Sequence, residues 1–208
     1  MCRILFVQTG GIIDSNNSDP AFKRFIEKRF SPSFQYEFTS IFQKDGNDIT
    51  DEDRVDMLEQ IDDLLELAFE AGNEFDGVII THGTDSMLET ARFLGCAELD
   101  DDRTAPRILI TGAMRSAYDK DSDADGNLGM AIAAVQTTPP GFVGICMHGL
   151  VLSHDMIDRD PFTGRFFRKR KMNTKGGRRS PKVAPTVRTF DCNKLPHVNH
   201  SNLVSYVS

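Results

Sequence analysis

The sequence of 208 residues contains no stretch of 18 or more consecutive apolar residues, which a membrane-spanning helix needs. Its first residues, Met1 to Arg3, lead directly into a short apolar run and lack the long apolar core and small-residue cleavage site of a signal peptide. Hydrophobic residues make up 39% of the chain and charged residues 26%, a composition that excludes disordered and collagen-like proteins. We therefore expect a globular, cytoplasmic protein with no membrane contact.

Closely spaced cysteines are also missing from the sequence. Cys2, Cys96, Cys146 and Cys192 are too far apart to form a CxxC metal or redox motif. Disulfides are uncommon in the cytoplasm, so we expect buried free thiols rather than disulfides.

Acidic residues are nearly absent from the C-terminal part of the chain. Residues 161–208 contain 11 Lys or Arg and one acid, Asp191, so they carry a charge of +10 and residues 1–160 carry −17, within a net charge of −7. Little helical or strand periodicity follows the basic run that begins at Arg165. We predict an α/β domain over residues 1–166 and a basic, partly irregular extension over residues 167–208.

The basic run from Arg165 to Lys182 has two interpretations. Clustered Lys and Arg release counterions when they bind phosphate, so the run could contact nucleic acid or an anionic surface. It could instead pair with the acidic body of its own or a neighbouring subunit. We favour pairing, because only Phe166 and Phe167 interleave with the charges, too few for a base-stacking surface.

Four short apolar runs indicate buried strands, and each is bounded by Gly, Pro or polar residues. The runs span residues 3–9, 76–81, 107–111 and 142–147. Strands that are apolar at successive positions are buried on both faces, as in a parallel sheet covered by helices.

Segments with apolar residues at helical spacing lie between these strands, over residues 50–69, 86–94 and 127–135. Thr50 and Asp53 resemble a capping box at the start of the first helix. Alternating strands and helices predict an α/β fold with a doubly wound parallel sheet and helices on both faces, in which ligands bind beyond the carboxyl ends of the strands.

The residues Thr81-His-Gly-Thr-Asp-Ser86 follow a predicted strand and open a predicted helix. Gly83 permits a sharp turn, while Thr84 offers an oxygen nucleophile and Asp85 a carboxylate beside helix N–H groups, an arrangement that suits acyl chemistry. Alternatively, Thr84, Asp85 or Ser86 caps the helix.

Four motifs resemble those of bacterial-type L-asparaginases. They are Thr9-Gly10-Gly11, Lys44-Asp45, the THGTD sequence of residues 81–85 and the TGAM sequence of residues 111–114, in that family's order and approximate spacing. From about residue 3 to residue 166 the chain looks like a short form with the N-terminal domain alone. The resemblance implies hydrolysis of asparagine, and often glutamine, to the acid and ammonia. It also implies a Thr nucleophile, no metal or organic cofactor, and a homo-oligomer, for which we expect a dimer.

Several positions depart from the family pattern. Ile12 stands where the family has the Thr that attacks the amide. The family's mobile loop supplies a Tyr, but residues 12–35 contain none, and the nearest, Tyr36, falls in a predicted strand. Gly46 aligns with a Ser that binds the substrate's α-carboxylate. The catalytic Lys aligns with Asp158 or Arg159.

These departures have physical consequences for a hydrolase. Arg159 keeps its proton, so it cannot become the neutral base that a Lys can. Ile12 fills the space of a carboxamide carbon. By resemblance we assign catalytic roles to Thr84, Asp85 and Arg159. We assign substrate contacts to Gly11, Ile12, Asp45, Gly46, Gly83 and Ala113.

The leading functional prediction is an asparaginase-type amidohydrolase, impaired or altered by Ile12, that acts on a small amino-acid amide. The alternative is a non-catalytic ligand-binding or regulatory protein on the same frame, with a basic arm that could bind nucleic acid.

Two further patterns resemble metal sites. Residues 121–126 match the first half of an EF-hand loop, but Ile132 stands where a bidentate Glu is required, and a helix is expected to follow. His82, His148 and His154 follow no metal-binding spacing, and we expect His82 to be a structural hydrogen-bonding group. The sequence therefore predicts no metal site.

Overall fold

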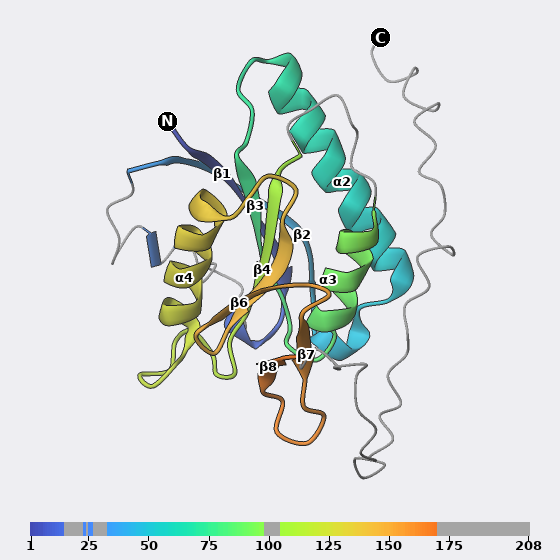
Figure 1. Ribbon diagram of the computed structural model, residues 1–208, viewed down its shortest axis with the longest axis vertical. Coiled ribbons are helices and arrows are strands. Elements are labelled where there is room, and N and C mark those ends of the chain that lie inside the picture. Colours follow the sequence, from blue (N-terminus) through green and yellow to red (C-terminus); the bar gives the residue numbers. More distant parts are fainter. Residues whose placement is uncertain (15–22, 24, 27–32, 98–104, 170–208) are drawn as a thin grey trace, which may run out of the picture.

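The computed structural model describes residues 1–14, 23, 25–26, 33–97 and 105–169. Their centre is a six-stranded sheet in the order β2-β1-β3-β4-β5-β6 (Figure 1). The first five strands are parallel and β6 is antiparallel to β5. The strands are β1 (Arg3–Gly10), β2 (Gln35–Lys44), β3 (Gly77–Thr81), β4 (Arg107–Thr111), β5 (Val143–Met147) and β6 (Leu150–Ser153).

Helices cover both faces of the sheet, as the sequence predicted. Helices α2 (Asp51–Glu70) and α3 (Met87–Cys96) lie on one face, and α4 (Ala124–Thr137) lies on the other (Figure 1). Alternate residues of β1 divide between the two cores: Leu5 packs with α2 and α3, and Phe6 packs with α4. The α/β fold class is therefore confirmed.

The remaining elements are short. The 3₁₀ helices η1 (Ile12–Asp14) and η2 (Gly46–Asp48) follow β1 and β2. Strands β7 (Ile157–Arg159) and β8 (Phe166–Arg168) form a separate antiparallel pair. No helix among the described residues combines the length and apolarity needed to cross a membrane.

The predicted capping box at the start of α2 is confirmed. The Asp53 N–H donates to Thr50 Oγ1 at 3.2 Å, and the Thr50 N–H donates to Asp53 Oδ2 at 2.8 Å. These two bonds satisfy backbone donors that a helix start would otherwise leave unpaired. They also fix the direction in which α2 leaves the end of β2.

Strand β2 is the largest element that the apolar runs did not reveal. It is the edge strand, and most of its residues are exposed or half-buried, so its sequence carries no continuous apolar run. Tyr36 lies on this strand, as expected. Helix α4 begins at Ala124, so residues 124–132 are helical and do not form the second half of an EF-hand loop.

The cysteine prediction is wrong for one residue. Cys2 and Cys146 are free thiols, but Cys96, at the end of α3, is disulfide-bonded. Burial raises the pKa of the Cys146 thiol to about 12, which leaves this residue inert at neutral pH. Separation along the chain says little about distance in the fold, so the spacing could not single out Cys96. Cys192 lies outside the described residues.

The predicted boundary between residues 166 and 167 falls inside β8, which spans Phe166–Arg168. Beyond it, the Lys169 N–H donates to the carbonyl oxygen of Met156 at 2.8 Å. Residues 170–208 lie outside the described part of the chain. The division into a domain and a basic extension therefore stays a prediction.

Candidate functional site

A cleft of about 550 Å³ opens at the carboxyl ends of the parallel strands. This is the edge of an open α/β sheet at which ligands bind. Most of the residues assigned to the site from the sequence line this cleft: Gly11, Ile12, Asp45, Gly83, Thr84, Asp85, Ala113 and Arg159. Five further residues also line it: Gly10, Asp14, Gln43, Lys44 and Met114.

Three glycine backbones pack against one another beside the cleft. Gly11 has φ +83°, and a Cβ atom there would lie 2.5 Å from the Cα of Gly83. A Cβ atom on Gly83 would lie 2.6 Å from the Cα of Gly46. Gly46 thus packs against Gly83 and is not among the residues that line the cleft. Its predicted contact with a substrate stays a prediction.

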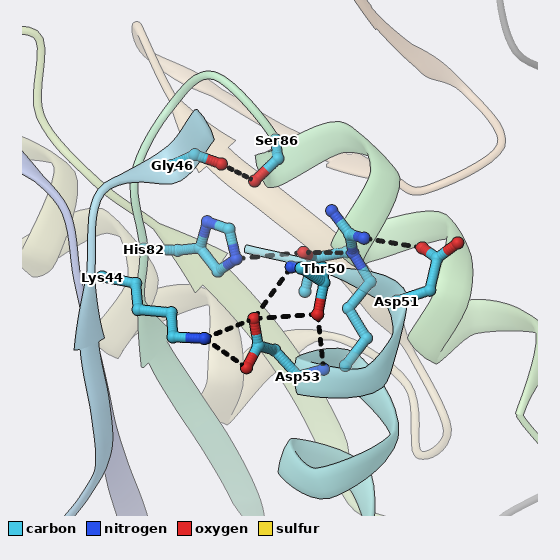
Figure 2. A network of polar contacts seen from close by, with 9 residues as sticks. Lys44, Gly46, Thr50, Asp51, Asp53, His82 and Ser86 are labelled. Atoms are coloured by element: carbon cyan, nitrogen blue, oxygen red, sulfur yellow. Dashed lines mark hydrogen bonds and ion pairs between the residues drawn. The ribbon is translucent and has the colours of Figure 1, made fainter. Parts of the chain in front are cut away.

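Gly46, which aligns with the family's Ser, also has little room for a side chain. A Cβ atom built on Gly46 would lie 3.2 Å from the backbone nitrogen of Asp85. The side chain of Ser86 instead donates to the carbonyl oxygen of Gly46 (Figure 2). Close backbone approach at this point explains a glycine better than ligand contact does.

Thr84 and Asp85 stand together in the turn before α3. Thr84 is 9% exposed, and its hydroxyl makes no hydrogen bond to another residue in the described part of the chain. Asp85 Oδ1 accepts a hydrogen bond from Arg159 Nη2 at 2.8 Å, and its Oδ2 accepts one from Asn47 Nδ2 at 3.3 Å. The Asp85 carboxylate is therefore held from two sides, whereas no described residue holds the Thr84 hydroxyl.

Of Asp158 and Arg159, the two residues that could align with the family's Lys, only Arg159 lines the cleft. Asp158 points to Arg92, with Oδ1 3.5 Å from Nη2, and does not line the cleft. Arg159 lines the cleft and reaches Asp85, and its guanidinium carbon lies 6.0 Å from the centre of the Phe166 ring. A permanent cation therefore occupies the place beside the Thr-Asp pair.

Ile12 begins η1 and is 45% exposed at the mouth of the cleft. It has no hydroxyl, so this side of the cleft presents a β-branched hydrocarbon where the family presents a nucleophile. The neighbouring Ile13 is fully buried, which anchors the turn and fixes Ile12 in place.

Two charged residues of the cleft were missed by the sequence analysis. Asp14 is 3% exposed, and its Oδ2 accepts a hydrogen bond from Thr81 Oγ1 at 2.6 Å. Lys44 Nζ donates to both carboxylate oxygens of Asp53, at 2.7 and 2.8 Å (Figure 2). Asp14 is a lone carboxylate after two isoleucines, with no spacing signal. Lys44 carried a signal, since it belongs to the Lys44-Asp45 motif.

The ion pair between Lys44 and Asp53 stabilises the charged form of the carboxylate. Partial burial raises the pKa of Asp53, but hydrogen bonds from Lys44 and Thr50 outweigh it and bring that pKa below its usual value. The same carboxylate belongs to the capping box, so it ties the end of β2 to the start of α2.

A buried network of polar side chains includes His82 (Figure 2) and contacts the main chain of Gly83, next to Thr84. His82 Nδ1 lies 2.7 Å from the carbonyl oxygen of Gly83, and its Nε2 lies 3.0 Å from Thr90 Oγ1. Arg54 Nε donates to the same Thr90 oxygen at 3.1 Å. Burial lowers the pKa of His82 to about 4, and the nearby Arg54 charge adds to the effect. His82 is thus a structural hydrogen-bonding group, as predicted.

Within the described ranges, no group of three His, Cys, Asp or Glu residues could hold a metal ion.

Comparison with known proteins identifies relatives of this chain. A family model described as Asparaginase, N-terminal, matches residues 3–192. The L-asparaginase of Thermococcus kodakarensis is 29% identical over 157 residues, which are 72% of this chain and 45% of that relative. A glutamyl-tRNA(Gln) amidotransferase subunit from Aeropyrum pernix is 38% identical over 93 residues, which are 45% of this chain and 21% of the relative.

Solved structures show the same fold. A probable cytoplasmic L-asparaginase from Campylobacter jejuni superimposes with a TM-score of 0.63 at 24% identity, over 82% of this chain and 57% of that chain. The match thus covers about half the length of the Thermococcus and Campylobacter proteins, and 21% of the Aeropyrum subunit. Because the family match covers nearly the whole chain and the cleft lies where its motifs meet, the chain belongs to the asparaginase family.

Proposed function

We propose that the cleft binds a small amino-acid amide, or the corresponding acid, without efficient hydrolysis by this chain. The observation that carries the proposal is the contact between Arg159 and Asp85, with Nη2 2.8 Å from Oδ1. A Thr nucleophile needs a neighbouring group that can take its proton. Arg159 stays protonated at any pH a protein meets, so it can hold a charge there but cannot accept that proton.

The charges of the cleft suit an amino acid. Carboxylates of Asp14, Asp45 and Asp85 line it together with the cations of Lys44 and Arg159. A free amino acid carries one charge of each sign, and a cleft with both signs can pair with both ends. Gly11 and Gly83 also line the cleft, so main-chain groups border the space that a small ligand would occupy.

A second candidate is hydrolysis through Thr84, and one observation favours it. Thr84 lines the cleft, and its hydroxyl has no hydrogen-bond partner among the described residues, so we take it to be available to a substrate. In this mechanism the Thr84 oxygen attacks the amide carbon, the C–N bond breaks, and the nitrogen leaves as ammonia with the hydroxyl proton. Water then cleaves the resulting ester, which releases the acid and restores the Thr84 hydroxyl. Asp85 orients Thr84 or holds the substrate's amino group. The proton acceptor must then come from the substrate or from water, which makes the reaction slow.

Thermal-shift and ammonia-release assays on the purified chain test both candidates in one plate. L-asparagine, L-glutamine and L-aspartate are added separately, and Thr84→Val serves as the matched variant because it keeps the branched shape and loses the hydroxyl. The proposal predicts a rise in Tm with at least one ligand and ammonia release equal to that of Thr84→Val. Turnover that Thr84→Val abolishes would establish the second candidate instead, and no shift with any ligand would refute binding.

We also propose that the chain forms a homodimer, and that the basic run after Arg165 pairs with acidic surface in preference to nucleic acid. The opposite charges of the two parts of the chain, +10 and −17, support this pairing. Light scattering of the full chain tests the dimer. A salt-sensitive mobility shift with DNA or RNA that disappears on truncation after Phe167 would contradict the pairing.

A further inference from the structure

The polar network runs from Asp51 on α2 to His82 (Figure 2), whose ring contacts the carbonyl oxygen of Gly83, next to Thr84. It begins at Asp51, whose side chain is 81% exposed and whose Oδ1 accepts from Arg54 Nη1 at 2.7 Å. Arg54 is only 5% exposed, although it belongs to the otherwise acidic helix α2. Thr90 on α3 and His82 after β3 are fully buried. The network therefore joins three elements through side chains that water does not reach.

The two ends of this network can each take only one hydrogen-bonding role, and this fixes the roles of the groups between them. The carbonyl oxygen of Gly83 can only accept, so His82 Nδ1 carries the proton. Nε2 of the neutral ring then accepts from the Thr90 hydroxyl. The Thr90 oxygen in turn accepts from Arg54 Nε, which can only donate. The Gly83 carbonyl on one side of the ring, and Thr90 with Arg54 on the other, thus favour the same tautomer of His82.

The His82 tautomer fixes a peptide group at the cleft. All peptide bonds of the described residues are trans, so the Gly83 oxygen and the Thr84 N–H point in opposite directions. Because the Gly83 oxygen faces His82, the Thr84 N–H points away from the buried ring. This N–H makes no hydrogen bond to any other residue that the structure describes, and Gly83 and Thr84 both line the cleft.

We propose that Arg54 and Thr90 are positioning residues that act through His82 to hold the Gly83–Thr84 peptide with its N–H directed into the cleft, as a donor to an oxygen of the ligand. A polar donor that the fold leaves without a partner is costly unless water or a ligand satisfies it. The positioning itself stands on the geometry of the network. Its effect on affinity rests on the proposed function.

The experiment uses the full chain labelled with ¹⁵N and three variants. Thr90→Val removes the hydroxyl and keeps the branched shape, whereas Thr90→Ser keeps the hydroxyl. Thr111→Val is the matched control, because Thr111 is also fully buried and its hydroxyl donates to the carbonyl oxygen of Cys146 at 2.9 Å, outside the network. NMR reports which His82 nitrogen carries the proton and how the Thr84 amide signal shifts. Calorimetry gives the affinity for L-aspartate and L-asparagine.

The proposal predicts the Nδ1–H tautomer in the wild type and in Thr90→Ser. Thr90→Val should show a mixture of tautomers, a shifted Thr84 amide signal and affinity weakened about tenfold, the effect of one lost charge-assisted hydrogen bond. Thr111→Val should lower Tm without changing the tautomer or the amide signal.

A purely structural role for the network would give a different result. Thr90→Val would then lower Tm and leave both the His82 tautomer and the Thr84 amide signal as in the wild type, which would overturn the proposal. Failure of the wild type to bind either ligand would refute the proposed function alone, because the NMR signals test the positioning without a ligand.

Discussion

The two sides of the cleft hold their polar groups differently. The β1–β2 wall, formed by Gly11, Ile12, Lys44 and Asp45, has charged side chains that are already paired: Lys44 with Asp53, and Asp45 with the N–H of Gly46. The β3–β4 wall, formed by Gly83, Thr84, Asp85 and Ala113, presents a hydroxyl and an N–H of Thr84 that bond to no other described residue.

The two walls therefore differ in what they can contribute to binding a ligand and to hydrolysing it. On the β1–β2 wall the one position that the family uses for attack is a hydrocarbon, Ile12. On the β3–β4 wall Arg159 holds the Asp85 carboxylate, and His82 lies 2.7 Å from the carbonyl oxygen of Gly83. The proposed function, binding without efficient hydrolysis, rests on this contrast. Four perturbations test this contrast between the walls.

Restoring chemistry to the β1–β2 wall should have the largest effect. Ile12→Thr combined with Arg159→Lys supplies a hydroxyl and a cation that can lose its proton. Ammonia release from L-asparagine should rise on the order of a hundredfold, the lower range for a positioned acid or base. The control pair is Ile12→Val with Arg159→Lys, which has the same shape without the hydroxyl. Equal rates in the two double variants would show that Ile12 is not what limits turnover.

The β3–β4 wall should weaken in acid because of His82. Its pKa is about 4 in the folded chain and 6.5 in the unfolded chain, so between these values the unfolded chain binds the proton more readily. The free energy of unfolding should therefore fall by roughly 3 kcal/mol as the pH drops from about 6.5 to about 4.

Urea unfolding across this pH range measures the loss. The Asp53 carboxylate has a lowered pKa, so its contribution is lost only as the pH falls below about 3.8, outside this window. His82→Gln lacks the titrating ring and should show a flatter profile. A wild-type profile as flat as that of the variant would contradict a buried, neutral His82.

The glycine contact that joins the two walls should tolerate no side chain. Gly83→Ala places a Cβ atom 2.6 Å from the backbone of Gly46, so the main chain must move. We expect a loss of about 2 kcal/mol in the free energy of unfolding, as for overpacked cores. Gly126→Ala is the control, since its Cβ atom would meet nothing within 4 Å and a helical alanine is slightly stabilising. Equal stability of the two variants would mean that the walls meet less closely than these distances require.

The smallest effect should come from Asp53, which pairs with Lys44 of the β1–β2 wall. Asp53→Ala removes both the partner of Lys44 and the capping box of α2. The expected loss is about 1 kcal/mol in thermal or urea unfolding, typical of a lost helix cap. Glu52→Ala, in the same exposed turn, removes a similar charge without the cap. If Asp53→Ala and Glu52→Ala lost the same free energy of unfolding, the loss would come from the removed charge and not from the helix cap.

The buried elements of the fold were predictable from the sequence. Strand β4 has the predicted bounds, and β3 and β5 each begin one residue later than predicted. These strands are apolar at successive positions because both faces are covered. Strand β2 was found only in part, through Tyr36, because an edge strand needs no such run. Strands β7 and β8 are three residues each, too short for any period to show.

The site was less predictable than the fold. The motifs singled out Thr84 and Asp85, which line the cleft, but the choice between Asp158 and Arg159 needed the geometry of β7, because only Arg159 lines the cleft. The contribution of Gly46 depends on how closely two backbones approach, which no alignment records. Arg54 and Thr90 are 36 residues apart, and only the packing of α2 on α3 brings them together.

Isothermal titration calorimetry with L-asparagine distinguishes binding from continuing hydrolysis in a single run, because each process has its own heat signal. If the cleft binds the amide without efficient turnover, the titration should give a saturable heat of binding that returns to baseline after each injection. A sustained heat signal after saturation, lost in Thr84→Val, would show that the chain hydrolyses the amide and would contradict binding without turnover.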